Sequence, residues 1–229
     1  MLLALLGTDR SNRLSGDQLV ARLTEAGCRA RPAPLLGKLL GLETTGHVVV
    51  ERSPSYSFGL TPLGQDVAYG AGPGTPVDVV LVMADLVGFT AYTERCGDSS
   101  AHQASELLAT VAEVELAGAG GRLVKPLGDG FLGALPSAAP AVDVLRRIRK
   151  RLVQPDGTAW AVHAGVRHGR PIQHRGDLFG SDVNLVARLC QAAGPDEVIV
   201  SGAPGTGERQ SLAVRGIDPA VPVYREALA

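Results

Sequence analysis

Apolar residues recur at helical spacing in the first part of the chain. The stretch Ser15-Gly-Asp-Gln18 has the pattern of a helix capping box, and apolar residues follow it on one helical face until Gly27. A second apolar face begins after Pro34 and stops at Gly46. Its leucines are Leu35, Leu36, Leu39, Leu40 and Leu42. The pattern predicts two amphipathic helices.

After these helices the sequence becomes typical of β-strands. Residues His47–Arg52 and Tyr56–Leu60 are rich in β-forming residues and are separated by Ser53-Pro-Ser55. Two such runs with a short polar connection predict a hairpin. Thr61-Pro62 then places a proline at the first position of a further helix. The predicted order is helix, helix, two-stranded wing, helix.

A break in composition divides the chain. Residues 69–76 hold three glycines and two prolines, which can neither continue a helix nor join the interior of a sheet. A length of 229 residues fits either one large domain or two smaller ones. We therefore predict a domain over 1–70, a linker over 71–76 and a second domain over 77–229.

The first segment resembles the winged helix-turn-helix regulators of the PadR and MarR kind over about residues 10–70. The resemblance rests on Leu42-Glu43-Thr-Thr-Gly46-His47-Val48 and on Leu60-Thr61-Pro62-Leu63-Gly64. In that family the helix before the first wing strand, here 34–43, enters the major groove of double-stranded DNA. The candidate DNA contacts are Lys38, Arg29, Arg31 and Arg52. Lys38 is the only base on that helix, so a wing used for dimerisation or protein contact remains an alternative.

A nearly continuous apolar run over residues 77–84 is typical of a strand buried on both faces. It ends in Asp85, and a helix is predicted soon after. That order sets a carboxylate, which can bind a metal ion, beside helix N-terminal amides that can hold phosphate. Candidate substrate-binding residues are Leu86, Gly88, Phe89 and Thr90. The alternative is that Asp85 only caps the helix.

Two further blocks carry polar residues in apolar surroundings. Residues 120–135 predict strand, tight turn, strand, with Asp129 at the turn, although Gly-Asp-Gly alone indicates no more than a hairpin. Asn184 and Arg188 are four residues apart, which places them on one face of a predicted helix.

In their order and spacing, these blocks resemble the class III adenylate and guanylate cyclase catalytic domain over about residues 77–226. The resemblance implies an α+β fold with a ferredoxin-like cyclase domain behind the winged helix-turn-helix domain. It also implies that Asp85 and Asp129 bind two Mg²⁺ or Mn²⁺ ions in each site. Asn184 and Arg188 match the residues that stabilise the transition state in the family.

The resemblance assigns base recognition to Lys125 and Asp177. A lysine donates to adenine N1 and an aspartate accepts from the N6 amine, whereas guanine has the opposite pattern at both atoms. The substrate is therefore expected to be ATP. In homodimeric members the two kinds of site residue come from different subunits, which implies composite active sites. The short connection between Gly165 and Asp177 leaves the mode of dimer contact open.

The composition of the chain limits the kinds of partner that the protein is expected to bind. The formal net charge of −1 gives no overall attraction to nucleic acid or to anionic membrane. The three cysteines have no spacing typical of a disulfide framework or a zinc site. The apolar stretch Met1–Leu6 is far shorter than the roughly 20 residues that cross a bilayer. We expect a cytoplasmic protein with no membrane partner.

Two other features are interpreted as structural. His163 and His168 flank Gly165, and no acidic partner for them is evident in the sequence. The basic run Arg146–Arg151 is interpreted as a solvated helix face.

The leading hypothesis is a homodimeric adenylate cyclase that converts ATP to 3′,5′-cyclic AMP and pyrophosphate, fused to a winged-helix domain for DNA binding or regulation. The alternative is a transcriptional regulator whose cyclase-like domain senses a nucleotide without significant turnover. The sequence favours the enzyme, because a pure sensor has no need of both metal aspartates together with Asn184 and Arg188.

Overall fold

The computed structural model divides the chain into two compact units. The N-terminal unit comprises Met1–Val77 with Ile172–Leu178, and the C-terminal unit comprises Asp78–Pro171 with Phe179–Ala229. The structure describes residues 6, 13–25, 32–44, 47–52, 56–61, 64, 67–68, 74–203, 205, 209–214 and 216–229. In the chain the first unit ends at Val77, and the later segment Ile172–Leu178 also belongs to it.

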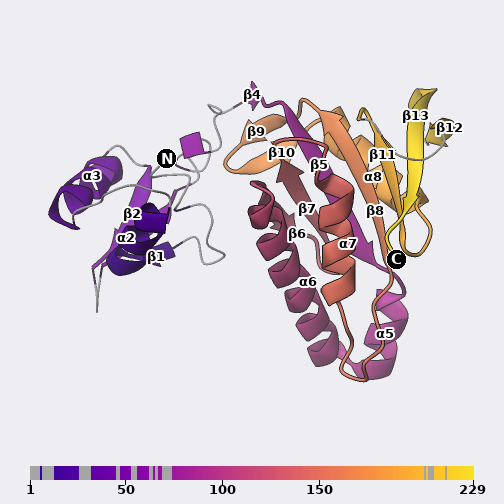
Figure 1. The fold of residues 1–229 in the computed structure, drawn as a ribbon, viewed down its shortest axis with the longest axis horizontal. Helices are drawn as coiled ribbons and strands as arrows, with labels where there is room; N and C mark the ends of the chain where they lie inside the picture. The colour runs from indigo at the N-terminus through magenta and orange to yellow at the C-terminus, as the bar shows by residue number, and fades with distance from the viewer. Residues whose placement is uncertain are drawn as a thin grey trace. The chain divides into compact units, whose positions relative to one another are not determined.

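Two helices and a small sheet form the N-terminal unit (Figure 1). The helices are α2 (Gly16–Glu25) and α3 (Pro32–Thr44), and the strands are β1 (Arg13–Ser15), β2 (Val48–Glu51) and β3 (Ser57–Leu60). The predicted hairpin is confirmed, since β2 and β3 pair antiparallel. The capping box is also confirmed: the Ser15 amide donates to Gln18 Oε1 at 2.8 Å, and the Gln18 amide donates to Ser15 Oγ at 3.2 Å.

Strand β1 was not predicted from the sequence. It pairs antiparallel with β3, which sets Leu14 opposite Phe58 and gives the sheet order β1-β3-β2. Three residues are too few to show a strand period, so only the pairing reveals this strand. The core of the unit consists of apolar side chains from all five elements and from Leu6. They are Leu6, Leu14, Leu19, Leu23, Leu35, Leu39, Val48, Val50, Phe58 and Leu60.

The predicted helix after Thr61 lies mostly outside the described residues. So do two of the predicted DNA contacts, Arg29 and Arg31.

A mixed sheet is the scaffold of the C-terminal unit. In space its strands follow the order β12-β13-β11-β8-β5-β7-β6, and all neighbours are antiparallel except β8 and β11. The strands are β5 (Val79–Leu86), β6 (Arg122–Pro126), β7 (Gly130–Leu135), β8 (Val162–Gly169), β11 (Glu197–Ser201), β12 (Arg209–Val214) and β13 (Ile217–Ala227). Helix α6 (Asp98–Gly118) connects β5 to β6, and α7 (Ala141–Arg151) connects β7 to β8. The order β8-β5-β7-β6 with these two helices is the predicted ferredoxin-like arrangement.

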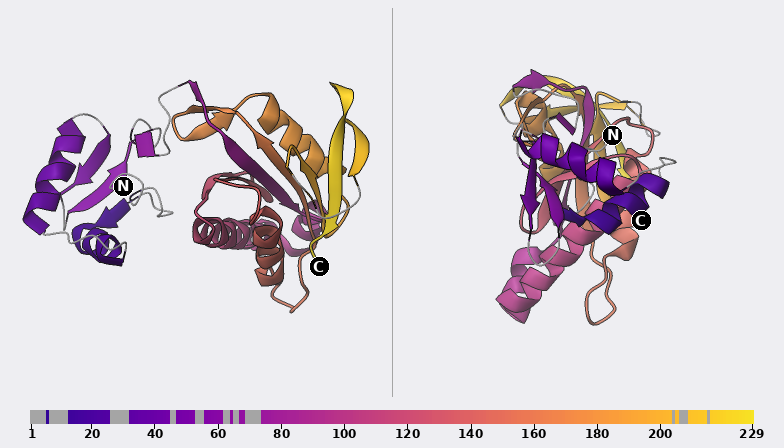
Figure 2. Two further views of the ribbon diagram at one scale, coloured as in Figure 1. Left: turned by 45° about the horizontal axis from the view of Figure 1, so that its top comes forward. Right: turned by 90° about the vertical axis from the view of Figure 1, so that its left-hand side faces the viewer.

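Helices cover both faces of this sheet (Figure 2). Val80, Val82 and Ala84 alternate along β5 and face a core shared with α6, α7 and the short helix α5 (Phe89–Cys96). On β11 the intervening residue Ile199 packs instead with helix α8 (Ser181–Ala192). Helix α8 also packs against β5, where Leu81 is fully buried, so both faces of β5 are covered, which explains its continuous apolar sequence.

Part of the predicted linker forms a strand. Thr75–Pro76 is β4, which pairs antiparallel with β9 (Ile172–His174), and β9 in turn pairs with β10 (Asp177–Phe179). The Gly74 amide donates to the Gln173 carbonyl at 2.9 Å. Pro76 is compatible with this pairing because β4 is an edge strand, where a missing N–H is tolerated. Residues 71–73 lie outside the described ranges.

The basic run on α7 makes ion pairs that the sequence did not indicate. Arg147 and Arg151 both donate to Glu115 of α6, at 2.7 and 2.8 Å. These two hydrogen bonds lower the pKa of Glu115. Arg149 is paired with Asp196 in the turn before β11. The basic residues of the run are mostly exposed, as interpreted, and their ion pairs also link α7 to α6 and to the turn before β11.

None of the helices in the described ranges is long and apolar enough to cross a membrane.

We predict that Asp196 stabilises the C-terminal unit in a pH-dependent way. Its carboxylate accepts two hydrogen bonds from Arg149 and one from the Val162 amide, and the Arg149 bonds lower its pKa most. Asp196→Asn should lower the free energy of unfolding by about 1–2 kcal/mol at pH 7. A depressed carboxyl pKa gives stability that is present above about pH 4 and is lost as pH falls through the lowered pKa.

Urea unfolding followed by the fluorescence of Trp160, the single tryptophan, measures this effect. Asn is a suitable replacement because Asp196 has a positive φ of 54°, which Asn tolerates. Asp143→Asn is the matched control, since that exposed carboxylate pairs with Arg146 at the surface and should change stability by a few tenths of a kcal/mol. Equal losses in the two variants at pH 7 would contradict the prediction.

Candidate active site

Asp85 lies near the end of the central strand β5. Its register partners are Gly130 on β7 and His163 on β8, and its side chain is about one third exposed. The residue at the N-cap of α5 is Gly88, with φ 75°. The alternative interpretation of Asp85 as a helix cap is therefore excluded, and its carboxylate is available for another role.

Asp129 lies in the turn of the β6–β7 hairpin, as predicted. The Leu86 amide donates to the Asp129 carbonyl at 2.9 Å, and the Leu127 amide donates to the Gly130 carbonyl at 2.8 Å. These bonds fix the turn against the end of β5. The structure thus brings the two predicted metal ligands together, because Asp85 lies opposite Gly130 and its neighbour Leu86 is hydrogen-bonded to Asp129.

The environment disfavours a negative charge on Asp85. Burial raises the pKa of Asp85, and the neighbouring charge of Asp129 raises it further, whereas His163 lowers it. Two carboxylates in contact repel one another when both are ionised. A cation bound between them would relieve that repulsion.

Glycine is required beside this pair. A β-carbon at Gly130 would lie 2.7 Å from Asp85 Oδ1 and 2.7 Å from the Ala84 carbonyl oxygen. On the other side of Asp129, Gly128 has a φ of 82°, a conformation that favours glycine. The Gly-Asp-Gly sequence is thus explained by the close approach of Asp85 to Gly130 and by the left-handed conformation of Gly128.

His163 is a site residue that the sequence analysis missed. Its Nδ1–H donates to the Cys190 carbonyl of α8 at 2.7 Å, and its Nε2 lies 3.7 Å from Asp85 Oδ2. The interpretation that neither histidine has an acidic partner was wrong, since His168 Nε2 lies 2.6 Å from Asp78 Oδ1. Asp85 lies on β5 and Asp78 directly precedes that strand, and the antiparallel pairing of β5 with β8 brings the two carboxylates to the histidines.

The thiol of Cys190 is buried behind this site. Burial and the charge of Asp85 raise the pKa of Cys190 to about 12, so the thiol stays protonated and unreactive. It donates to the His163 carbonyl at 3.4 Å. Helix α8 is thereby attached to β8 at the level of Asp85.

The four predicted substrate-binding residues follow Asp85 directly: Leu86 ends β5, Gly88 lies in the turn, and Phe89 and Thr90 begin α5. Leu86 has its side chain in the core, so only its main chain is available to a ligand. Gly88 and Thr90 are exposed, and Phe89 is partly buried near Trp160, with 6.4 Å between ring centroids. Their roles stay predictions.

The remaining predicted residues lie on β6, β10 and α8. Lys125 places its ammonium group 5.8 Å from the ring centroid of Phe179, a contact that the sequence did not indicate. Asp177 begins β10, and its Oδ1 accepts the Leu178 amide at 2.7 Å. Asn184 and Arg188 are both exposed on α8, which confirms that they share a face of one helix.

The start of helix α8 is hydrogen-bonded to β8 and to the residue after it through Asp182. Arg167 Nε donates to Asp182 Oδ1 at 2.8 Å, and the Arg170 amide donates to Asp182 Oδ2 at 2.9 Å. With the His163 contact near its other end, both ends of α8 are attached to β8 and the residue after it. The positions of Asn184 and Arg188 on the surface are fixed accordingly.

Among the residues that the structure describes, no group of three or more His, Cys, Asp and Glu side chains is placed to hold a metal ion. The candidate metal ligands are the two carboxylates alone.

Known proteins resemble part of this chain. No family model matches the chain. An adenylate cyclase of Streptomyces griseus is 38% identical over 120 residues, which are 52% of this chain and 30% of that protein. The crystal structure of the guanylyl cyclase Cya2 superposes with a TM-score of 0.57 at 16% identity, over 67% of this chain and 93% of that one. The crystal structure of an adenylate/guanylate cyclase/hydrolase from Silicibacter pomeroyi superposes with a TM-score of 0.56 at 22% identity, over 66% of this chain and 97% of that one.

The C-terminal unit has the nucleotidyl cyclase fold. The chain spans about 30% of the length of the curated relatives that it matches. We refer to residues 78–171 and 179–229 as the cyclase-like unit.

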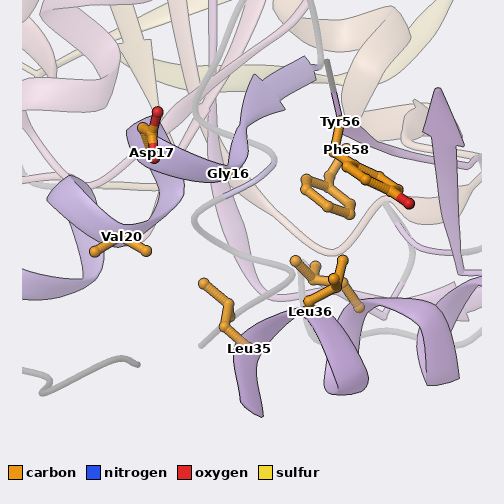
Figure 3. A pocket seen from close by; sticks show the side chains of 8 residues that line it. Gly16, Asp17, Val20, Leu35, Leu36, Tyr56 and Phe58 are labelled. Atoms are coloured by element: carbon orange, nitrogen blue, oxygen red, sulfur yellow. The ribbon is translucent and has the colours of Figure 1, made fainter. Parts of the chain in front are cut away.

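The N-terminal unit offers less for DNA contact than its sequence suggested. Lys38 is exposed on α3. Arg52, however, donates to both carboxylate oxygens of Glu43, so its positive charge is paired within the unit. A pocket of about 160 Å³ lies between α2, α3 and the hairpin. Figure 3 shows Tyr56 and Phe58 on one side of it and Leu36 on the other.

We predict that Gly130 is indispensable to the carboxylate pair. Gly130→Ala should lower the free energy of unfolding by about 1–3 kcal/mol, because the new methyl group overlaps the Asp85 carboxylate and the β5 backbone. Urea unfolding measured by Trp160 fluorescence tests this. Gly118→Ala, at an open and exposed position in α6, is the control and should be neutral or stabilising. A neutral Gly130→Ala would show that Asp85 does not approach the turn as described.

Proposed function

We propose that the protein is an adenylate cyclase that converts ATP to 3′,5′-cyclic AMP and pyrophosphate. The observation that carries the proposal is that the fold holds Asp129 beside Asp85 near the end of β5, through the hydrogen bond from the Leu86 amide to the Asp129 carbonyl and the pairing of Asp85 with Gly130. It occurs in a unit with the nucleotidyl cyclase fold and in a chain 38% identical over 120 residues to an adenylate cyclase. In this reaction the ribose 3′-oxygen attacks the α-phosphorus, the bond to the pyrophosphate oxygen breaks, and the hydroxyl proton leaves to solvent.

The residues present fit a pair of Mg²⁺ or Mn²⁺ ions. Asp85 and Asp129 would hold them, because carboxylate oxygens are the ligands that these cations prefer. The raised pKa of Asp85 supports this, since a cation would offset both burial and the charge of Asp129. When bound, the ions would activate the 3′-hydroxyl and neutralise triphosphate charge.

The chain's own residues would bind and orient the nucleotide. The backbone of the turn at Gly88 would face the triphosphate at the start of α5. Lys125 would donate to adenine N1 and Asp177 would accept from the N6 amine, as predicted from the sequence. The ring of Phe179 would hold the Lys125 ammonium group for that role.

Exposed Asn184 and Arg188 support the proposal of a homodimer with composite sites. Both side chains point away from the core of their own unit, because the buried residues of α8 are on its other face. On the surface they can serve a site completed by a second chain. Arg188 would neutralise charge on the α-phosphoryl oxygens, and Asn184 would orient the ribose.

The N-terminal unit is proposed to regulate the cyclase-like unit. Its helices and hairpin follow the predicted order, but the ion pair between Arg52 and Glu43 weakens the case for double-stranded DNA. Contact of Lys38 with DNA stays a prediction. The alternative of a nucleotide sensor without turnover is separated from the enzyme by the product assay that follows.

We predict that Asp85→Asn and Asp129→Asn each abolish product formation while the fold is retained. Each change removes an anionic metal ligand with little change in shape, so the loss should be at least 100-fold. The measurement is cyclic AMP and pyrophosphate formed from ATP with Mn²⁺, beside circular dichroism. Asp98→Asn, at an exposed position in the first turn of α6, should keep full activity. Wild-type protein that binds ATP and forms no product would instead establish the sensor.

A second prediction tests the composite site. Asp85→Ala and Arg188→Ala chains, each inactive alone, should recover about a quarter of wild-type activity when mixed at equal amounts. Random exchange makes half of the dimers mixed, and each mixed dimer keeps one intact site of two. Activity after denaturation and joint refolding gives the result. As a control, each variant refolded alone should show no activity. If the mixture also shows none, although differential tagging proves that mixed dimers have formed, the composite arrangement is overturned.

A further inference from the structure

A separate pocket of about 200 Å³ lies in the cyclase-like unit. Its lining comes from α5, from the first half of α6 and from the loop between α7 and β8. The predicted catalytic residues are not among its lining residues. All the residues that line it belong to one compact unit, and the structure describes every one of them.

Aromatic rings form the deepest part of this pocket. Tyr92 and Trp160 are 6% and 4% exposed, and their rings meet edge to face with 4.8 Å between centroids. Ala104 and Leu107 of α6 add apolar surface. An apolar cavity of about 150 Å³ is large enough for benzene, so this volume suits one aromatic ring with a small substituent.

The polar groups of the pocket are few and neutral. The Ser100 hydroxyl donates to the Cys96 carbonyl at 3.0 Å, which leaves it able to accept a hydrogen bond from a ligand. Gln103 adds an exposed amide, and every lining side chain is uncharged. A charged ligand would lose hydration here without gaining an ionic partner. The chemistry therefore favours a neutral aromatic molecule with one hydrogen-bond donor.

The pocket is connected to the turn that follows Asp85. The ring of Trp160 lies 6.4 Å from that of Phe89, between centroids. The next residue after Trp160, Ala161, accepts a hydrogen bond from the Val87 amide at 2.9 Å. Any displacement of Trp160 by a ligand would thus act on both Val87 and Phe89, which flank Gly88.

We propose that this pocket is an effector site for a small neutral aromatic molecule of the size of phenol, and that its occupancy changes nucleotide affinity at the Val87–Phe89 turn. The second half of this statement rests on the proposed function. The first half, binding in the pocket, is independent of it.

Binding is measured on the full chain with phenol as the probe. Trp160 is the single tryptophan, so its fluorescence reports on the pocket directly. We expect a saturable change with a dissociation constant of about 1 mM or lower. Ala104→Leu should fill the pocket and weaken phenol binding at least tenfold. Ala117→Leu, the same change at an exposed position of α6, should leave it unaltered.

Circular dichroism checks that the variants fold, and Leu107→Phe replaces Ala104→Leu if the latter does not. A fluorescence change that stays linear to tenfold above the expected constant would overturn the binding site. So would unaltered phenol binding in the folded, filled variant.

Linkage is measured by equilibrium dialysis of a non-hydrolysable ATP analogue with Mn²⁺, with and without saturating phenol. We expect a change in analogue affinity of threefold or more, and the same factor in phenol affinity when the analogue is present. Equal affinities would overturn the coupling. An analogue that does not bind at all, while phenol binds, would refute the proposed function and the coupling with it, and would leave the pocket standing.

Discussion

The main constraint on the cyclase-like unit is that two carboxyl groups lie side by side near the end of its central strand. Asp85 is the second-last residue of β5, and Asp129 is held beside it by a main-chain hydrogen bond from Leu86. Burial and the like charge of Asp129 both raise the pKa of Asp85. Such an arrangement costs stability unless a cation compensates it, and costly arrangements of this kind concentrate at functional sites.

The surrounding structure keeps this pair in place without neutralising it fully. Gly130 leaves room for the Asp85 carboxylate, and His163 attaches β8, the strand next to β5, to α8. Asp182 and its partner Arg167 hold the other end of that helix. The exposed face of α8 is therefore rigid relative to the carboxylates, which suits a helix whose polar residues serve a reaction.

Short sequence patterns predicted many of the helices, strands and turns. The features that they did not predict depend on how distant strands pair. The capping box at Ser15, the hairpin turn at Asp129 and the shared face of Asn184 and Arg188 each depend on residues a few positions apart. The three-residue strand β1 and the approach of His163 to Asp85 depend on pairing across distant segments, which no local pattern encodes. The aspartates were recognised as a pair only through motif order, and that their segments lie side by side is seen only in the structure.

Binding of Mn²⁺ in the presence of the non-hydrolysable ATP analogue, followed by electron paramagnetic resonance of the free ion, tests the cation site most directly. The wild-type chain should bind Mn²⁺ with an affinity that rises with pH through the raised pKa of Asp85, because the ion displaces the proton from that carboxyl group. In Asp85→Asn the affinity should fall at least tenfold and lose that pH dependence. Equal Mn²⁺ affinity in the wild-type chain and the variant at every pH would contradict the account.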